Sequence, residues 1–406
     1  MAKCKEHPLD VDIDEKDLSI GITTHGLLIL IAALSCLVAC LVSAYLICKH
    51  AQNFTKPSQQ RQWVLVHHKS LCRYELTTPF RVIRILFMVP VYSIACVCSI
   101  IFYRQHIYIA ATYEFYESLV IAAFFLLLCQ ILHVNLAILQ TDLAELQPKP
   151  WIPPIRLVAY CFGNRTGKAL NGQIWFNTIC VGVLQFCVVK FLGALVKCIT
   201  EAAGVYCKEL NSASHAKIWV MVVEIISMVS AMMCLLQFYK EIRHRIAEHQ
   251  PMLKFLAIKL VIMVFYIQSF IFSFTTKPGG PVKPTAHISY PSWAVGIPNT
   301  LLCIEMVFAS VLHLYAFPYR PYQNNQTCSN EDSEALERTD QSEGVYQGLS
   351  TADSHYDSIW SGGTKRSAKP RTSARGAVLQ ALGFKEILQG IGKAAKWFFV
   401  LRRRQR

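Results

Sequence analysis

The sequence predicts an all-α, polytopic membrane protein, a seven-transmembrane helix bundle whose N-terminus lies outside the cell or in a lumen and whose C-terminus lies in the cytoplasm. Three observations carry this prediction. Of the 406 residues, 53% are hydrophobic and only 16% are charged, whereas a soluble domain carries about 25% charged residues. The apolar residues come in long blocks, and the basic residues favour alternate connecting loops. This composition excludes an ordinary soluble enzyme and a mainly disordered protein.

Seven apolar blocks are long enough to cross a bilayer as helices, which takes about 20 residues each. None of them reads as the alternating segments of about ten residues that build a membrane β-barrel. The first block follows an acidic segment and is too long for the core of a signal peptide, so we expect it to be a retained span. The seven expected spans cover residues 26–48, 82–103, 117–139, 174–197, 217–239, 254–275 and 294–316.

Basic residues are concentrated in the first, third and fifth loops between these blocks. Because positively charged loops stay on the cytoplasmic side and the N-terminal tail is acidic, the N-terminus is expected outside. The net charge of +14 therefore indicates orientation and attraction to anionic lipid, and it requires no nucleic-acid partner. The basic residues that set this orientation are Lys49, Lys56, Arg61, Lys69, Arg73 and Arg81 in the first loop, Lys149, Arg156, Arg165 and Lys168 in the third, and Lys240, Arg243 and Arg245 in the fifth.

The chain divides into four parts by composition. Residues 1–25 form an outer tail, expected to be mobile, and residues 26–320 hold the transmembrane domain. Residues 321–375 are rich in polar side chains and are expected to be a disordered cytoplasmic tail. In residues 376–406, apolar side chains recur at helical spacing before a cluster of arginines. This pattern is typical of a basic amphipathic helix on the anionic cytoplasmic leaflet; the alternative is a helix packed on the protein's own loops.

The sequence shows almost no motif of catalysis. It contains no GxGxxG, GxxxxGK[ST], HExxH or GxSxG, so we expect neither an enzyme nor a bound cofactor. None of the sixteen cysteines forms a CxxC pair, and no metal site is expected. Cys198 and Cys207 fall in the same short outer loop and are a candidate disulfide.

Charged residues inside the spans are the most informative ones. Each costs roughly 2.5–3.5 kcal/mol to insert, and so tends to face the bundle interior beside a partner. Lys190 and Glu224 lie at similar depth near the outer ends of their spans, and Glu117 opens the third span. These residues predict an outer polar layer. Pro90 removes a backbone donor within the second span and predicts a kink in that helix.

An inner polar layer is predicted from Lys259 in the sixth span and Glu305 in the seventh. His133 lies in the inner half of the third span, Gln130 lies one turn above it, and both are candidates for this layer. Two interpretations of the layers are open. They line the pathway of a solute, or they are ion pairs that only hold helices together.

Five stretches of sequence carry a resemblance to a known family: RVIRILFMVPVYS at 81–93, YESLVI at 116–121, LQFCVVK at 184–190, FYKEIRHRIAEHQPMLKFLAIKLVIM at 238–263 and NTLLCIEMVFASVLHLYAFPY at 299–319. In this order they resemble the organic solute transporter alpha / transmembrane protein 184 family (Ostalpha), over residues 25–320. The positions that match the family's pattern are Arg84, Pro90, Tyr92, Glu117, Lys190, Lys259 and Glu305.

The resemblance implies seven spans with the N-terminus outside, and transport of amphipathic organic solutes such as organic anions and steroid conjugates. The family's alpha subunit works with a small single-span partner; such a partner subunit or a homo-oligomer are the assemblies left open for this chain. The alpha subunit also has a cysteine cluster suited to acylation in its third loop, where this chain has only Cys161 as a candidate. Other members of the family are linked to vesicle traffic or vacuoles.

Transport of organic solutes is the function we predict, and a non-transporting endomembrane protein that acts in vesicle traffic, as a scaffold or as a receptor is the alternative. A G-protein-coupled receptor is disfavoured because the third span lacks Asp-Arg-Tyr and the seventh lacks Asn-Pro-x-x-Tyr. A retinal protein needs a Schiff-base lysine in its last span, and residues 294–316 contain none. The expected location is a multi-pass one in the plasma membrane or in an endomembrane such as the vacuole or the endosome.

Overall fold

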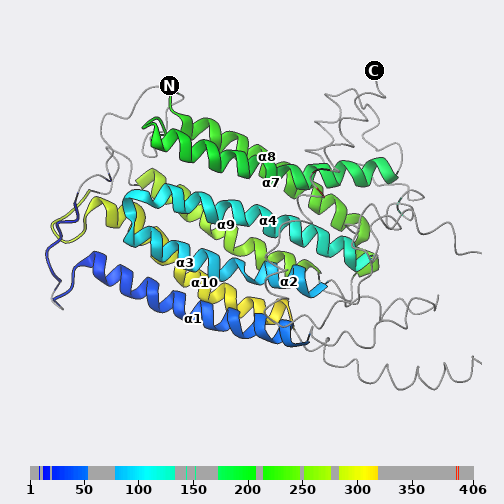
Figure 1. The fold of residues 1–406 in the computed structure, drawn as a ribbon, viewed down its shortest axis with the longest axis horizontal. Coiled ribbons are helices and arrows are strands. Elements are labelled where there is room, and N and C mark those ends of the chain that lie inside the picture. The colour runs from blue at the N-terminus through cyan, green and yellow to red at the C-terminus, as the bar shows by residue number, and fades with distance from the viewer. Residues whose placement is uncertain are drawn as a thin grey trace, which may run out of the picture.

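The computed structural model shows a bundle of long helices that lie side by side along one direction (Figure 1). The prediction of an all-α fold is confirmed for the described residues, where the only β-type pairing is an isolated bridge between Thr285 and Ile288. The structure describes residues 9, 12–18, 21–53, 78–132, 143, 151, 172–206, 214–246, 251–275, 283–318, 390 and 392.

The described residues of each of the seven predicted blocks fall largely on helices. Six segments of the described residues are long and apolar enough to cross a membrane: Thr24–Gln52, Arg81–Ile101, Tyr103–Leu132, Gly172–Ala202, Ala216–His244 and Ser292–Ala316. A 3-10 turn, η2 (Tyr103–Gln105), joins α3 to α4, and a π-helical turn, η4 (Ser292–Gly296), leads into α10. The helices are α1 (Thr24–Asn53), α2 (Thr78–Leu86), α3 (Met88–Ile101), α4 (His106–Leu132), α7 (Gly172–Ala202), α8 (Ala216–Ile246), α9 (Pro251–Thr275) and α10 (Ile297–Ala316).

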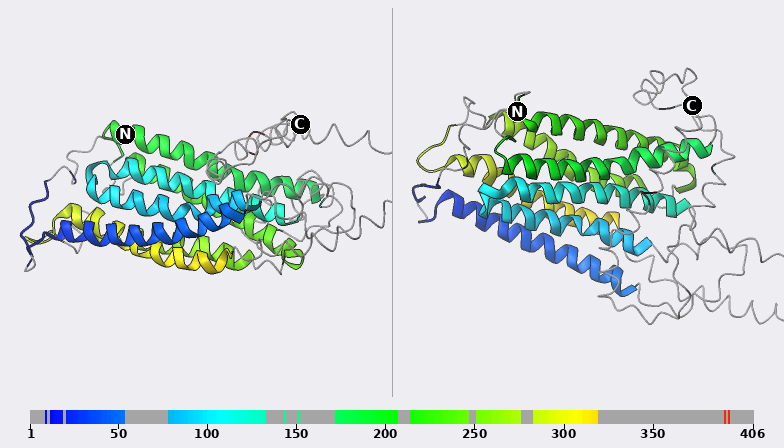
Figure 2. Two further views of the ribbon diagram at one scale, coloured as in Figure 1. Left: turned by 60° about the horizontal axis from the view of Figure 1, so that its bottom comes forward. Right: turned by 45° about the horizontal axis from the view of Figure 1, so that its top comes forward.

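Helix α4 is at the centre of the bundle. Every residue from Tyr116 to Ile131 is buried, and α4 contacts α2, α3, α7 and α8. A helix that is apolar on all sides suits such a position, because it has no face that favours water. In the left view of Figure 2, α3 and α4 (cyan) lie between the green pair α7 and α8 on one side and α1 (blue) and α10 (yellow) on the other.

Large apolar side chains are exposed along the outer faces of the peripheral helices. Leu41 on α1, Ile199 on α7 and Ile226 on α8 are exposed by 63%, 66% and 65%. Contiguous apolar surface of this kind is unusual on a soluble protein, whereas the hydrocarbon core of a bilayer covers it without cost.

Helix α4 begins eleven residues earlier than predicted, at His106 instead of residue 117. Polar residues such as His106 and Glu114 interrupt the apolar pattern here, but they have partners inside the protein: the His106 Nδ1 lies 2.8 Å from the Tyr103 carbonyl oxygen. Glu117 therefore lies within α4 and not at its outer end. The last part of the predicted span, residues 133–139, lies outside the described residues.

The second predicted span is interrupted between α2 and α3, close to Pro90. The Phe87 N–H donates to the Ile83 carbonyl oxygen at 3.0 Å, and the Val91 N–H donates to Phe87 at 3.1 Å. Pro90 has no N–H to donate to the Leu86 carbonyl, and its ring crowds that carbonyl. The break between Leu86 and Met88 thus lies where a kink caused by Pro90 is expected.

The contact between α7 and α8 is built on two glycines of α7. A Cβ on Gly182 would collide with the Cys234 sulfur, and a Cβ on Gly193 would collide with the Glu224 carboxylate. Small residues let membrane helices approach closely and gain packing energy. Gly193 in addition leaves the space in which the carboxylate of Glu224 is held.

Gly182→Ala should force α8 away from α7 and lower the free energy of unfolding by about 1–3 kcal/mol, the usual cost of overpacking. Because the obstacle is a sulfur atom, Cys234→Ala in the same background should recover part of the loss. Val188→Ala, at an exposed position of α7, is the control and should have little effect. Thermal unfolding followed by size-exclusion chromatography measures all three, and a Gly182→Ala variant as stable as the parent would contradict the close approach.

Glu15 fixes the N-terminal tail to the end of the bundle where α1 and α10 begin. Its Oε1 accepts hydrogen bonds from the Ser289 N–H at 2.8 Å, the Ser289 hydroxyl at 2.7 Å and the Ser292 hydroxyl at 2.6 Å. Its Oε2 accepts one from the His25 N–H at 2.7 Å. These bonds tie the tail to the start of α1 and to the segment before α10, so residues 12–18 are held in place, against the expectation of a mobile tail.

The charge of Glu15 makes this contact sensitive to acid. Burial alone would raise the pKa of Glu15, but hydrogen bonds from Ser292, Ser289 and His25 outweigh it and hold the pKa below its ordinary value. A carboxyl whose folded-state pKa is lowered stabilises the fold above its unfolded pKa, and this contribution is lost as pH falls through the folded-state pKa. The tail contact is therefore complete at neutral pH and opens only below pH 4.5, the ordinary pKa of the group.

Glu15→Gln should release the tail at neutral pH, because an amide replaces an acceptor-only carboxylate. Hydrogen bonds to charged groups contribute about 1.5–3 kcal/mol, so protection of the Lys16 N–H, which donates to the Ala286 carbonyl at 2.9 Å, should fall at least about tenfold in hydrogen exchange. Asp14→Asn, an exposed position, is the matched control. Equal protection in parent and Glu15→Gln would show that the carboxylate does not hold the tail.

The C-terminal segment 376–406 is described at Gly390 and Gly392 alone. Gly390 is buried, and a Cβ on it would lie 3.5 Å from the Cδ1 of Leu184 on α7. At this point the segment therefore lies against the bundle. The rest of the predicted amphipathic helix and the predicted disordered tail, residues 321–375, lie outside the described residues.

Candidate functional site

Four charged side chains from three helices meet near the end of the bundle where α4 and α8 begin, and we call them the charge cluster: Glu114 on α4, Lys190 and Lys197 on α7, and Glu224 on α8. The Lys190 Nζ lies 2.7 Å from the Glu224 Oε2 and 3.2 Å from the Glu114 Oε2. The Lys197 Nζ lies 3.0 Å from the Glu224 Oε1 and also contacts Glu114. Each lysine thus binds both carboxylates.

Helix geometry explains why α7 supplies both lysines. Lys190 and Lys197 are seven residues apart, which is close to two turns, so they lie on one face of the helix. Gly193 lies between them and makes room for Glu224. The lysine side chains are only 3% and 10% exposed, and a buried cation is tolerated only where anions compensate it. The two glutamates do so, and the charge cluster is neutral as a whole.

A small group of buried side chains lies beside the charge cluster. Tyr206, which follows α7, is buried with Ile107 and Ala216. Burial raises the pKa of Tyr206 to about 12; the nearby Lys197 lowers it and the nearby glutamates raise it. Its phenol is therefore neutral at physiological pH and adds no charge to the cluster.

The structure brings together part of the predicted outer layer and adds two residues to it. Lys190 and Glu224 are in contact, as the residue counting suggested, whereas Glu117 is not part of the charge cluster. Glu114 and Lys197 were missed. Glu114 precedes the predicted third span, which starts at residue 117, because α4 begins earlier than predicted. The seven-residue spacing between Lys190 and Lys197 was the signal that could have found Lys197.

Glu117 occupies a separate position deeper in the bundle. It is 0% exposed, and the Tyr92 hydroxyl on α3 donates to its Oε2 at 3.4 Å. The Oε1 has no hydrogen-bond partner among the described residues. Lys259 on α9 and Lys190 are the cations within its electrostatic range.

The predicted inner layer does not form as a unit. Among the described residues, no ion pair joins Lys259 to Glu305; the Gln268 amide donates to the Glu305 Oε2 at 3.4 Å instead. The pairing predicted for Lys259 and Glu305 is therefore wrong in this structure. Gln130 accepts a hydrogen bond from Arg81 on α2 at 2.7 Å, and His133 lies outside the described residues.

Lys259 and Glu305 do not pair because they lie at different depths on two antiparallel helices. α9 and α10 run in opposite directions, and α10 begins at Ile297, so Glu305 lies less than halfway along α10 from its first residue, which lies at the end of the bundle where α9 ends. Gln268 lies at the same distance from the outer end of α9, whereas Lys259 lies nine residues further in. At 1.5 Å per residue, this separates Lys259 and Glu305 by roughly 13 Å along the axis.

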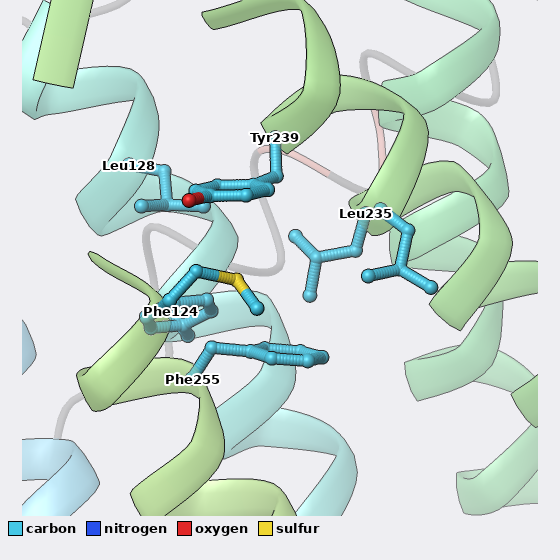
Figure 3. A pocket seen from close by; sticks show the side chains of 7 residues that line it. Phe124, Leu128, Leu235, Tyr239 and Phe255 are labelled. Carbon is cyan, nitrogen blue, oxygen red and sulfur yellow. The ribbon is translucent and has the colours of Figure 1, made fainter. Parts of the chain in front are cut away.

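A small apolar pocket lies on the inner side of Lys259, between α4, α8 and α9 (Figure 3). It has room for about one water-sized group. Met252 and Phe255 precede Lys259 at helical spacing, so that the pocket and the cation lie on one face of α9. The lining residues are Phe124, Leu128, Leu235, Leu236, Tyr239, Met252 and Phe255.

The cysteine predictions are tested only in part by the geometry. Cys198 is a free thiol, and both Cys207, its predicted partner, and Cys161, the candidate for acylation, lie outside the described residues. Within the described residues, no three His, Cys, Asp or Glu side chains are grouped as metal ligands would be.

Apolar helices of membrane-spanning length with buried charges between them define this chain as an integral, multi-pass helical membrane protein. Its residues 28–322 match the family model of the organic solute transporter Ostalpha. The chain belongs to this family of membrane transporters, which confirms the resemblance seen in the sequence. No solved structure matches the chain.

Lys190→Met should destabilise the bundle by about 3–5 kcal/mol, because it leaves a buried carboxylate without one of its two cations. Lys190→Met combined with Glu224→Gln should recover part of this loss, since Lys197 and Glu114 remain as a balanced pair. Lys240→Met, at an exposed position of α8, is the control and should cost less than about 0.5 kcal/mol. Thermal unfolding in detergent gives these differences; parent-like stability of Lys190→Met would refute a structural role of the charge cluster.

Proposed function

We propose that this protein carries amphipathic organic solutes, organic anions among them, across a membrane. The observation that carries this proposal is Lys259. It is half-buried within α9, and among the described residues no carboxylate lies within 4.0 Å of it. A cation inside a membrane bundle without such a partner is a natural site for the anionic group of a solute.

The surroundings of Lys259 suit an amphipathic molecule. Its own helix face continues through Phe255 and Met252 into the apolar pocket, where the Phe255 ring also lies 5.8 Å from the ring of Phe124 on α4. Because the pocket itself has room for only about one water-sized group, an apolar body attached to an anionic group at Lys259 would lie along these side chains and not inside the pocket. Binding sites for small molecules are typically built in this way, with few polar groups on a mostly apolar lining.

The proposed topology has seven spans, with α9 as the span that completes the set. α9 is 25 residues long, which exceeds the length of about 20 that crosses a bilayer, and it lies along the other helices in Figure 1. An odd number of spans agrees with an N-terminus outside and a cytoplasmic C-terminus, as the basic loops suggest. Attachment of segment 376–406 to anionic lipid, and assembly with a small single-span partner or as a homo-oligomer, complete the proposal.

Uptake into proteoliposomes tests this function. The parent should take up labelled steroid sulfates above the level of empty vesicles, and Lys259→Met should lower this uptake at least about tenfold, since a charge-assisted hydrogen bond contributes about 1.5–3 kcal/mol. Uptake of a neutral steroid of similar shape should change less. Lys240→Met, an exposed lysine of the same protein, is the matched control.

Two results would contradict the proposal. No uptake of any anionic or neutral solute above empty vesicles would favour a scaffold in vesicle traffic. Equal uptake by the parent and by Lys259→Met would show that the solute binds elsewhere.

A further inference from the structure

Glu117 differs from the neighbouring glutamates in how little holds its carboxyl group. It is 0% exposed, one oxygen receives a long hydrogen bond of 3.4 Å from Tyr92, and the other has no partner among the described residues. Glu114 and Glu224, by contrast, each contact two lysines. The same part of the bundle therefore holds two carboxylates that are paired with lysines, and a third carboxyl group, that of Glu117, that is not paired with one.

Desolvation decides the form of such a group. An ionised carboxylate loses several kcal/mol on leaving water unless an ion and hydrogen bonds replace the solvent. A protonated carboxylic acid is neutral and costs only what a buried polar group costs. The charge cluster is already balanced without Glu117, so no surplus positive charge there compensates it.

The charged and titratable groups around Glu117 come from every helix that packs on α4. Tyr92 of α3, Lys190 of α7, Lys259 of α9 and Glu114 of α4 act on Glu117 itself. Arg84 of α2 acts on the neighbouring Tyr116, and Glu224 of α8 is bound by the cluster lysines. Lys190 is already engaged by carboxylates, which leaves Lys259 as the cation that an ionised Glu117 would attract.

We propose that Glu117 is a proton-binding site that controls access to Lys259. With its proton bound, Glu117 is neutral and leaves Lys259 to the anionic group of a solute. When the O–H bond of Glu117 breaks, the proton passes to water, the electron pair stays on the carboxylate, and the carboxylate pairs with Lys259 and displaces the anion. One proton and one anion are thus bound together and released together. The anion half of this proposal, the binding of a solute at Lys259, rests on the proposed function. The proton half, the binding of a proton at Glu117, does not.

Lys259 lies on the face of α9 that meets α4. Among the described residues α9 packs mainly on α10, and its contacts with α4 are few. The apolar pocket separates part of α9 from α4 and α8 (Figure 3). Phe255 packs on Phe124 of α4 with their ring centroids 5.8 Å apart, and Lys259 follows Phe255 by about one turn on the same face of α9. A change in the conformation of the long Lys259 side chain is the movement that this pairing requires.

Infrared difference spectroscopy of the full chain in lipid vesicles, without solute, tests the proton site. The parent should show the carbonyl band of a protonated carboxylic acid at neutral pH; Glu117→Gln should remove it and Glu224→Gln should keep it. Tyr92→Phe keeps the ring but removes the hydrogen bond, so the band should shift to higher frequency. A band unchanged in Glu117→Gln would overturn the proposal, and if that variant does not fold, an unshifted band in Tyr92→Phe would do so.

The pH dependence of anion uptake tests the coupling. Binding of one proton with each anion predicts an affinity of the parent that rises about tenfold per pH unit of acidification while Glu117 titrates. Glu117→Gln, a neutral mimic of the protonated acid, should keep uptake and lose this dependence. Parent-like pH dependence in Glu117→Gln would overturn the coupling. Absence of uptake in the parent would overturn the proposed function and the anion half together, and the infrared band would still decide the proton site.

Discussion

Two lysines on one face of α7 bind carboxylates from α4 and α8, and much of the bundle is arranged around this contact. A lysine that is 3% exposed inside a membrane bundle needs anions on the helices beside it. α4 must therefore present Glu114, and α8 must present Glu224, at the depth of Lys190 and Lys197. A shift of either helix by one residue would rotate its carboxylate by about 100° and carry it out of reach. Gly193 serves the same contact from the side of α7, because any larger residue would fill the position of the Glu224 carboxylate.

The elements of this fold could be predicted because length and hydropathy decide them. A block of about 20 apolar residues has few alternatives to a membrane helix, since backbone polar groups in lipid must bond within their own segment. The contact between Lys190 and Glu224 could be predicted for the same reason. α7 and α8 begin within two residues of the predicted positions, so counting residues along each helix gave the right depth. The role of Glu114 could not be predicted, because the polar start of α4 resembles a loop in sequence until the partners of its polar side chains are known.

Sequence patterns do not predict which side chains pair where the depth of a residue depends on where its helix begins and ends and on how the helix is rotated about its axis. Lys259 and Glu305 have opposite charge and lie in neighbouring spans, which suggested a pair. In the structure, Gln268 faces Glu305, and Lys259 lies further in. Hydropathy is nearly equal around α9, so nothing in the sequence indicates which of its sides meets α10. The position of Glu15 was equally hidden, because a short polar tail has no period, and only the fold brings Ser289 and Ser292 beside it.

The balance of charge separates the two interpretations of the polar residues. In the charge cluster, two lysines and two glutamates satisfy one another, so binding an anionic solute there would have to break ion pairs that hold three helices together. Deeper in the bundle, Lys259 and Glu117 are one cation and one acid within electrostatic range, but they do not form an ion pair. A site that must bind and release a charged solute needs groups whose best partner is not already fixed in place. For this reason the charge cluster is best understood as structure. In the proposed mechanism, an anionic solute and the ionised carboxylate of Glu117 compete for Lys259, and a proton on Glu117 favours the solute.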